Sequence, residues 1–322
     1  MTEPVRLVAD VGGTNARFAL IKGERGMPER ELTLPTIDFP NIADAAEHYL
    51  RQCGSPKVME GAVAIANPIT GDWLKMTNHR WAFSIEETRK RLGFERLLLV
   101  NDFTALALAL PAIPRSDLRQ VGGTQPVAGA AIALIGPGTG LGVSGLFPSR
   151  DGSWLPIAGE GGHVTMCASN AREAQIIDTC RLEYPHVSAE RLISGMGLTN
   201  LYTAIAKLAA AAPQALTPAE VTQRALAGSD PLCAEALQTF CAMLGSVSGN
   251  LALTLGAGGG LYVGGGIVPK LGDYFHRSPF RERFEAKGRF AGYLSPIPAY
   301  VIHAQNPALL GAAIALGVQP TP

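Results

Sequence analysis

The chain has 322 residues, enough for two domains with substantial cores. Its 27 Lys and Arg balance its 27 Asp and Glu, and 47% of its residues are hydrophobic, which is the composition of a soluble globular protein. The absence of net charge argues against partners such as nucleic acid or a membrane surface, and no apolar run approaches the roughly 20 residues of a membrane span.

The N-terminal part of the chain has the pattern of a mixed α/β sheet. Strands are predicted at residues 5–9, 17–21, 32–36, 58–65 and 97–100. Helices are predicted at residues 42–52 and 103–110. The segment 97–100 is fully apolar, which favours a central strand. Pro111 and Pro114 end the last of these helices and indicate a domain boundary.

The following part opens with a predicted hairpin and then becomes strongly helical. Helices are predicted at residues 170–181, 198–212, 219–227 and 233–255. Thr217 and Glu220 form a capping box around Pro218, which suits the first helical position. A final helix begins at Asn306-Pro307.

Two segments repeat one pattern of apolar strand, Gly-Thr turn and second apolar strand. The first is residues 8–21, around Gly13-Thr14, and the second is residues 133–147, around Gly138-Thr139. A glycine turn lets backbone N–H groups approach an anion, and here a strand follows the glycines where a Walker loop would have a helix. One such turn is typical of an ordinary hairpin. Two of them, with Asp10 placed to hold a metal ion, predict two walls of a phosphate site.

Asn101 and Asp102 stand where an apolar strand meets a helix. The simpler interpretation is that they cap the helix, because both residue types are favoured at that position. The alternative is that one residue caps while the other faces a ligand at the carboxyl end of the strand.

Further polar residues lie in turns. Glu160 and His163 flank Gly161-Gly162, where a carboxylate and an imidazole offer hydrogen bonds to adjacent hydroxyls. Glu190 begins a predicted helix. Its negative charge would interact favourably with the helix dipole there, and this interaction alone would explain the residue. Asn78, before His79-Arg80-Trp81, either lines a cleft or turns the chain.

The chain contains five scattered cysteines and no Cys-x-x-Cys pair. Dispersed thiols of odd number are typical of a reducing compartment, and no signal-peptide pattern precedes the first predicted strand. A cytoplasmic protein is therefore expected. After His163 the next cysteine is Cys167, with no zinc-binding spacing beyond it, so no structural zinc is expected.

In order and spacing, these motifs resemble those of bacterial glucokinases, within the actin and hexokinase superfamily. Residues 10–15 resemble the first phosphate motif, residues 136–140 the second and residues 258–266 the adenosine motif. Residues 98–103, 159–164 and 188–195 also match that family. The likeness runs from about Leu7 to the C-terminus, with Ala9 where the family usually has Gly. The missing cysteine cluster disfavours the related ROK sugar kinases.

The resemblance implies an α/β, two-domain actin-like ATPase (ribonuclease H-like) fold with an interdomain cleft. Residues 1–111 would form a small α/β domain completed by a C-terminal helix at 304–322, and residues 112–303 a large α/β domain. The implied reaction is ATP-dependent phosphorylation of glucose at its 6-hydroxyl, giving glucose 6-phosphate and ADP. A homodimer is the family expectation.

The resemblance also implies roles for individual residues. Asp102 would be the catalytic base, accepting the proton of the sugar hydroxyl as it attacks the γ-phosphate. The residues implied to bind sugar are Asn101, Asp102, Glu160, His163, Glu190 and Asn78. Those implied to bind ATP are Ala9, Asp10, Val11, Gly12, Gly13, Thr14, Gly138, Thr139, Gly140 and Gly265. Asp10 would hold Mg²⁺ through water.

Two alternatives stay open at this point. Another hexose kinase, for mannose, fructose or an amino sugar, would use the same machinery. A non-catalytic sugar- or nucleotide-sensing switch is a different class; such a protein is expected to have lost Asp10 or Asp102, and both are present.

Overall fold

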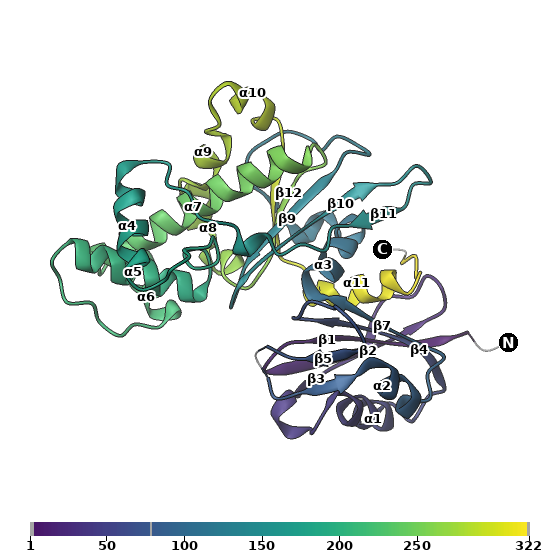
Figure 1. The fold of residues 1–322 in the computed structure, drawn as a ribbon. Coiled ribbons are helices and arrows are strands. Elements are labelled where there is room, and N and C mark those ends of the chain that lie inside the picture. Colours follow the sequence, from purple (N-terminus) through teal and green to yellow (C-terminus); the bar gives the residue numbers. More distant parts are fainter. Residues whose placement is uncertain (1–2, 78, 321–322) are drawn as a thin grey trace. The chain divides into compact units, whose positions relative to one another are not determined.

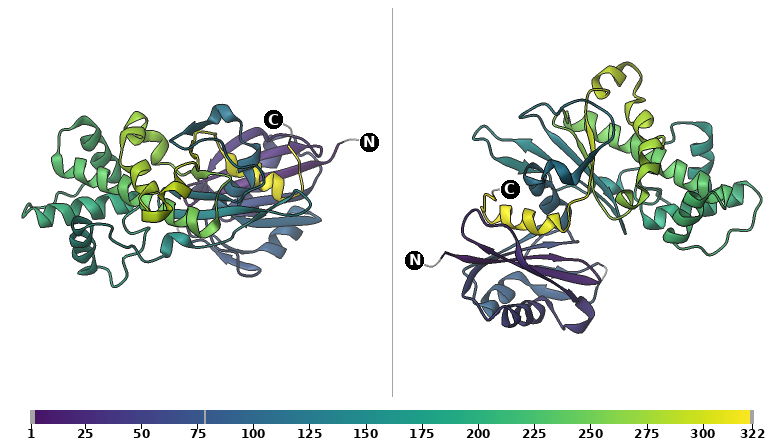
Figure 2. Two further views of the ribbon diagram at one scale, coloured as in Figure 1. Left: turned by 90° about the horizontal axis from the view of Figure 1, so that it is seen from above. Right: turned by 180° about the vertical axis from the view of Figure 1, so that it is seen from behind.

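The computed structural model describes residues 3–77 and 79–320 of the chain. Its internal contacts divide the protein into two units (Figures 1 and 2). Unit 1 comprises the chain up to Asp117 together with the segment from Ala304 onward, and unit 2 comprises Leu118–His303. Both units contain a mixed sheet with helices packed on it.

The sheet of unit 1 has the strand order β3-β2-β1-β4-β7. Its strands are β1 (Val5–Val11), β2 (Asn15–Lys22), β3 (Glu29–Pro35), β4 (Val58–Ile65) and β7 (Arg96–Asn101), and β5 (Trp73–Lys75) and β6 (Ala82–Ser84) form a separate hairpin. Strands β1, β4 and β7 run parallel, whereas β2 and β3 are antiparallel to their neighbours. Its helices are α1 (Ile42–Gln52), α2 (Ile85–Leu92), α3 (Asp102–Ala109) and α11 (Pro307–Ala315).

Two hydrophobic clusters cover the two faces of this sheet. Alternate residues of β1 divide between them: Leu7 and Val11 lie in the cluster with α1, and Val8 in the cluster with α3 and α11. Figure 1 shows α3 and α11 together on one face and α1 and α2 on the other. Helix α11 is apolar almost all round because it is buried between α3 and the sheet.

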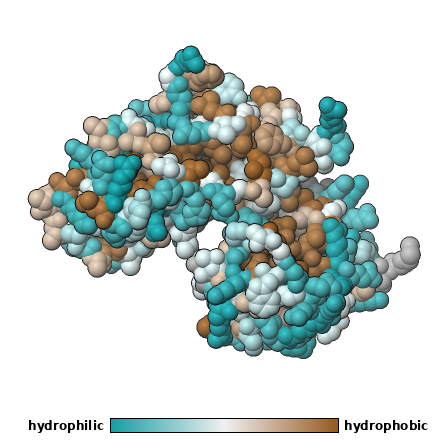
Figure 3. Space-filling model, viewed as in Figure 1, coloured by the Kyte–Doolittle hydropathy of each residue, from teal (hydrophilic) through white to brown (hydrophobic). Residues whose placement is uncertain are grey.

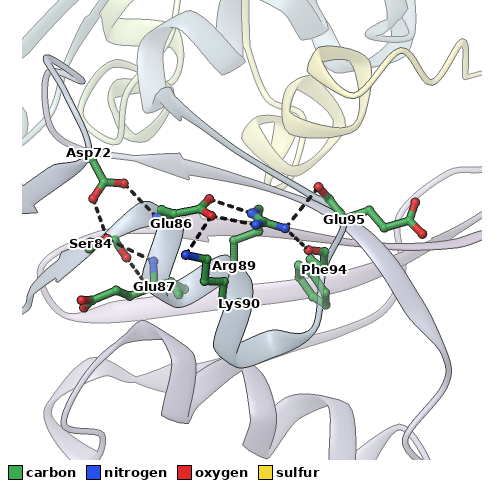
Figure 4. A network of polar contacts seen from close by, with 9 residues as sticks. Asp72, Ser84, Glu86, Glu87, Arg89, Lys90, Phe94 and Glu95 are labelled. Atoms are coloured by element: carbon green, nitrogen blue, oxygen red, sulfur yellow. Dashed lines mark hydrogen bonds and ion pairs between the residues drawn. The ribbon is translucent and has the colours of Figure 1, made fainter.

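Both ends of α2 are fixed by a polar network (Figure 4). The Ser84 hydroxyl caps the first turn and donates to Asp72 over 2.6 Å, while Asp72 accepts from the Glu86 N–H over 2.8 Å. At the other end, Arg89 donates twice to the Glu86 carboxylate and once to the Phe94 carbonyl. The network therefore joins α2 to the segments that precede and follow it.

Unit 2 repeats this strand order and adds one strand. Its sheet has the order β11-β10-β9-β12-β13-β8, in which β9, β12 and β13 are parallel and β10 and β11 antiparallel. The strands are β8 (Leu118–Gln120), β9 (Ile132–Pro137), β10 (Leu141–Pro148), β11 (Trp154–Pro156), β12 (Leu261–Val263) and β13 (Ala299–Ile302). Three antiparallel strands followed by two parallel ones thus occur in both units.

The helices of unit 2 share one large core with its sheet. They are α4 (Ala171–Arg181), α5 (Gly195–Leu208), α6 (Pro218–Ala227), α7 (Pro231–Leu255), α8 (Asp273–Arg277), α9 (Phe280–Glu285) and α10 (Ala291–Leu294). Short 3₁₀ helices lie at Thr36–Asp38, Leu110–Ala112, Arg115–Asp117, Gly161–His163, Val268–Leu271 and Gly288–Phe290. By length and composition α7 could span a membrane, contrary to the estimate from the sequence, but 72% of its apolar window is buried inside the protein. It is packed as a core helix.

Most predicted elements occur where the sequence places them, and one prediction about the sheet is wrong. Helix α1 and strand β4 have the predicted bounds, and the capping box of Thr217 and Glu220 is present at α6. The apolar segment 97–100 does not form a central strand, because β7 is an edge strand paired only with β4 in unit 1 as described. Its side chains contact helices on both faces of the sheet, and this contact explains their apolar character.

The packing of α11 on α3 depends on Gly311. A Cβ atom at this position would lie 1.7 Å from the Ala105 carbonyl oxygen, so the two helices approach too closely for any side chain there. We expect Gly311→Ala to destabilise the protein by about 1–3 kcal/mol through overpacking, measured by urea denaturation.

Gly292→Ala provides the matched control. Gly292 is also helical, in α10, and a Cβ there would meet no atom within 4 Å. This variant should be neutral or slightly more stable, because alanine restricts the unfolded chain. Equal stability of the two variants would show that the close approach of α3 and α11 does not limit the stability of unit 1.

Candidate active site

In unit 1 the carboxyl ends of three parallel strands meet at one edge of the sheet. Val11 of β1 pairs with Ile65 of β4, which pairs in turn with Asn101 of β7. Adjacent strands lie about 4.8 Å apart, so the turn after β1 and the start of α3 after β7 are separated by roughly 10 Å. The register therefore brings the first glycine turn and Asp102 to the same edge.

The turn between β1 and β2 is held by Thr36, a residue that the sequence did not single out. The Gly12 N–H donates to the Asn15 carbonyl over 2.9 Å and closes the hairpin. Thr36 is 1% exposed; its hydroxyl donates to the Gly13 carbonyl over 2.9 Å, and its N–H donates to the Thr14 carbonyl over 3.0 Å. Two carbonyls of the turn are thus bound from one side, which fixes its conformation.

Asp10 precedes this turn on β1 and pairs with Arg17 on β2. The Arg17 guanidinium donates to the Asp10 carboxylate over 3.1 Å, and the Asp10 side chain is 19% exposed. Burial raises the pKa of Asp10 above its ordinary value, and Arg17 offsets only part of this effect. Ala9 and Val11 have fully buried side chains, so only their backbone atoms are available to a ligand.

Asn101 and Asp102 differ in their roles at the start of α3. The Asn101 side chain is the N-cap and accepts from the N–H groups of Phe103 and Thr104 over 3.0 and 3.1 Å. One Asp102 oxygen accepts from the Phe103 N–H over 2.9 Å and from the Asn101 amide over 3.0 Å. The capping interpretation therefore holds for Asn101, which also orients Asp102.

A second residue that the sequence did not single out lies just after β4, at the same edge. Asn67 accepts from the Thr77 N–H over 2.9 Å and donates to the Lys75 carbonyl over 3.0 Å. Trp81 is fully buried, and its indole donates to the Phe39 carbonyl over 2.9 Å. These bonds hold both sides of the segment that contains Asn78, which itself lies outside the described residues.

Unit 2 has an equivalent edge at the carboxyl ends of β9 and β12. Its glycine turn is closed by a 2.8 Å bond from the Gly138 N–H to the Gly140 carbonyl, with Thr139 between them. Gly265 follows β12 with a positive φ of 77°, and a Cβ there would lie 2.3 Å from the Pro137 carbonyl oxygen. Only glycine allows this contact beside the turn.

The glycine-rich run at residues 258–266 is split by β12. Its second triplet, residues 264–266, lies at the edge just described. Its first triplet lies at the opposite end of β12, where Gly259 packs against the Ala130 and Ala131 carbonyls. Only the second triplet therefore lies beside the second glycine turn.

Glu190 contacts the second glycine turn directly. Its carboxylate accepts from the Leu141 N–H over 2.9 Å, and a Cβ added to Gly140 would lie 2.4 Å from the same oxygen. The family resemblance implied that Glu190 is one of the sugar-binding residues. In the structure its carboxylate also supports the second glycine turn, a contact that no local pattern in the sequence indicates.

The turn that carries Glu160 and His163 is packed against β10. A Cβ at Gly162 would lie 2.1 Å from the Leu141 carbonyl oxygen, so this glycine is required. The Gly162 carbonyl accepts from the Glu190 N–H over 2.8 Å. The side chains of Glu160 and His163 are exposed. Glu160, His163 and Glu190 therefore form one group around the second turn.

The predicted site residues thus form one group within each unit. Unit 1 brings together Asp10, the turn of residues 12–14, Asn101 and Asp102, whereas unit 2 brings together residues 138–140, Gly265, Glu160, His163 and Glu190. Backbone N–H groups at glycine turns suit phosphate oxygens. Carboxylates and an imidazole suit neutral hydroxyls, to which they offer acceptors and a donor.

A magnesium ion fits the donor set at Asp10. Mg²⁺ keeps several waters and takes one or two carboxylates together with substrate phosphates, so a single aspartate before a phosphate turn suffices. The described residues contain no group of three or more His, Cys, Asp or Glu side chains that could hold a metal ion.

These features define the class of the protein as an actin-like ATPase fold. A crystal structure of glucokinase from an Antarctic psychrotroph superposes with a TM-score of 0.89 and 36% identity, covering 97% of this chain and 98% of that one. A ROK family glucokinase from Streptomyces griseus, solved with glucose and AMPPNP, has a TM-score of 0.63 at 18% identity and shares the fold alone.

The sequence comparisons identify the family. The family model described as Glucokinase matches residues 7–319, and the chain belongs to this family. It is 56% identical over 314 residues to a glucokinase of Aromatoleum aromaticum and 54% identical over 311 residues to one of Neisseria meningitidis, covering 97% of this chain and 94% of each relative. The resemblance predicted from the motifs is confirmed.

The raised pKa of Asp10 predicts a stabilising substitution. A raised pKa means that the folded state disfavours the carboxylate, so Asp10→Asn should raise Tm at neutral pH. The gain should shrink as pH falls toward about 4, because the native aspartate then takes up its proton. Thermal unfolding at both pH values measures this, and lower stability of Asp10→Asn at neutral pH would show that the Arg17 pair outweighs burial.

Asp72→Asn is the control of opposite sign. Hydrogen bonds from the Ser84 hydroxyl and the Glu86 N–H lower the pKa of Asp72, so its charged form is favoured in the folded state (Figure 4). This variant should lose stability at neutral pH, and the loss should vanish in acid as native Asp72 becomes protonated.

Proposed function

We infer that the protein catalyses the ATP-dependent phosphorylation of glucose at its 6-hydroxyl, giving glucose 6-phosphate and ADP. Membership of the glucokinase family supports the reaction and both substrates. The structural observation that carries the proposal is the pairing of Val11, Ile65 and Asn101, which brings a carboxylate and a glycine phosphate turn to one sheet edge. A phosphoryl transfer to a hydroxyl needs both groups.

Asp102 acts as the base in this proposal. It accepts the proton of the attacking 6-hydroxyl, while Asn101 caps α3 and holds one oxygen of Asp102. The two hydrogen bonds to that oxygen orient the carboxylate at the start of α3. Asn78 joins the sugar-binding residues by resemblance.

Glu160, His163 and Glu190 bind the sugar hydroxyls in this proposal. A hydroxyl left unpaired in such a site costs about 1–3 kcal/mol, and this cost is how the site selects its sugar. Because Glu190 also contacts Gly140 and Leu141, it connects sugar binding to the second phosphate turn.

The two glycine turns bind the phosphates of ATP, and Gly265 leaves room for the adenosine beside the second turn. Asp10 would hold Mg²⁺ through water, and the ion would supply positive charge that neutralises the transferring phosphoryl group. We further propose that the enzyme works as a cytoplasmic homodimer, independent of nucleic acid and membranes.

The role of Asp102 is tested by Asp102→Asn, which keeps an oxygen for the Phe103 N–H. Loss of general-base help should lower kcat by about 10²–10⁴-fold with little change in Tm, measured by coupled ADP release. Asn101→Ala should instead cost about 0.5–2 kcal/mol of stability, because it removes the cap. Near-normal kcat for Asp102→Asn would remove Asp102 from the mechanism.

The division between sugar and phosphate residues is tested by steady-state kinetics. Glu160→Gln and His163→Ala should each raise the glucose KM roughly tenfold or more and change the ATP KM little, because each removes a charged or polar bond to sugar. Thr36→Val should raise the ATP KM and change the glucose KM little, because Thr36 holds only the first phosphate turn.

Thr88→Val is the matched control for Thr36→Val. Thr88 is also a buried threonine of unit 1, and its hydroxyl donates over 2.8 Å to the carbonyl of Ser84, the N-cap residue of α2. Thr88→Val should lower stability but change neither the glucose KM nor the ATP KM. An increase in ATP KM as large as that of Thr36→Val would show that the effect is general destabilisation.

A further inference from the structure

Unit 2 contains a pocket of about 370 Å³ that the proposed reaction does not use. It lies between the outer face of α7 and the segment of residues 161–169, beside β10. The residues that line it are Val143, Gly161, Val164, Thr165, Met166, Cys167, Ser169, Ser246, Val247, Asn250, Leu251, Thr254 and Lys287. Figure 3 shows apolar surface gathered over this part of unit 2. Its volume is that of a small-molecule site.

The lining of the pocket includes apolar side chains and one cation. Val143, Met166 and Leu251 supply apolar surface, and Lys287 is the charged group. The Lys287 ammonium donates to the Ser246 carbonyl over 2.9 Å, and its stem packs on Gly249. This arrangement holds the ammonium in place with donors left over for a ligand.

The groups packed around Lys287 leave its charge unbalanced. Arg283 forms a two-pronged ion pair with Glu173, at 2.6 and 3.2 Å. Glu173 is 3% exposed and also accepts from the Ser169 N–H. Its carboxylate is therefore engaged by Arg283 and Ser169 and does not balance the charge of Lys287. Among the described residues no ion pair joins Lys287 to a carboxylate. Burial and the neighbouring Arg283 lower the pKa of Lys287, which an anion beside it would reverse.

We propose that this pocket binds a small anionic molecule with an apolar body, such as an aliphatic carboxylate, and that its occupancy changes sugar binding. The second half of this statement rests on the proposed function. The anion pairs with Lys287 and the hydrocarbon part covers the valine, methionine and leucine side chains. Neither Glu160, His163 nor Glu190 lines the pocket, so it is separate from the sugar residues.

The pocket and the sugar residues share one backbone segment. Val164 and Met166 line the pocket, and their backbone groups pair with Ala189 and Val187 over 2.8 and 2.9 Å. The same segment carries Glu160 and His163, and its partner leads directly into Glu190. A ligand that moves residues 164–166 therefore acts on both halves of the sugar-binding group.

Cys167 provides a reporter of binding in the native protein. It lines the pocket and is exposed, whereas Cys180, Cys233 and Cys241 are buried, and Cys53 is half-buried in unit 1. The full-length protein is equilibrated with the symmetrical disulfides of mercaptohexanoate and mercaptohexanol. Attack by the Cys167 thiolate forms a mixed disulfide and releases one probe thiol. Mass spectrometry measures the occupancy of each cysteine.

We expect Cys167 to favour the acid over the alcohol roughly tenfold, because a charge-assisted bond to Lys287 is added. Cys53 is the internal reference and should show no such preference. Lys287→Met keeps the stem but removes the charge, so it should abolish the preference at Cys167 without loss of folding by thermal unfolding. Equal capture of both probes, or a preference that survives in Lys287→Met, would overturn the site.

The consequence for sugar binding is measured separately. Wild-type protein fully modified at Cys167 with the acid should show a glucose KM changed severalfold and an unchanged ATP KM, while the same modification of Lys287→Met should have a smaller effect. An unaltered glucose KM at full modification would overturn the coupling. Failure of Cys167 to react with either probe would also overturn the site, because the pocket would then be closed to a small molecule. Because probe capture needs no activity, it stands even if the proposed sugar roles fail.

Discussion

The chemistry of unit 1 depends on the register of three parallel strands. If β7 shifted by one residue against β4, every side chain of β7 would change face and Asn101 would no longer stand opposite Ile65. The cap of α3 and the direction of the Asp102 carboxylate would shift with it. Hydrophobic residues on both faces of β4 and β7 prevent such a shift, since each face has its own core. The position of the proposed base is therefore set by the packing of the two cores.

The repeated strand order explains why one kind of turn occurs twice. In each unit, the first strand of the hairpin has an antiparallel neighbour on one side, which is the second strand of the hairpin, and a parallel neighbour on the other side. The turn of the hairpin therefore lies beside the carboxyl end of that parallel neighbour. In unit 1 that neighbour leads to Asn67, and in unit 2 to Gly265. One architecture thus presents a phosphate turn with a different adjoining group in each unit.

Local patterns predicted most of the longer elements and both glycine turns, because apolar periodicity, caps and turn glycines act over a few residues. They did not predict that β7 lies at an edge, since an apolar edge strand covered by helices resembles a central one. Thr36 and Asn67 were missed because their partners are backbone groups 23 and 10 residues away, which no local pattern records. The contact of Glu190 with Leu141 spans 49 residues and was missed for the same reason.

The insertion of unit 2 within unit 1 has a consequence for biosynthesis. Helix α11 follows the whole of unit 2 in the chain, yet it completes the apolar layer that covers β1, β2 and β4. On the ribosome, the first 117 residues must wait with that sheet face covered only in part, by α3, while the next 186 are made. Unit 2 is continuous and can fold as it emerges. The nascent N-terminal segment is therefore the part that chaperones must protect, and translation arrest before α11 yields a chain with an open β face.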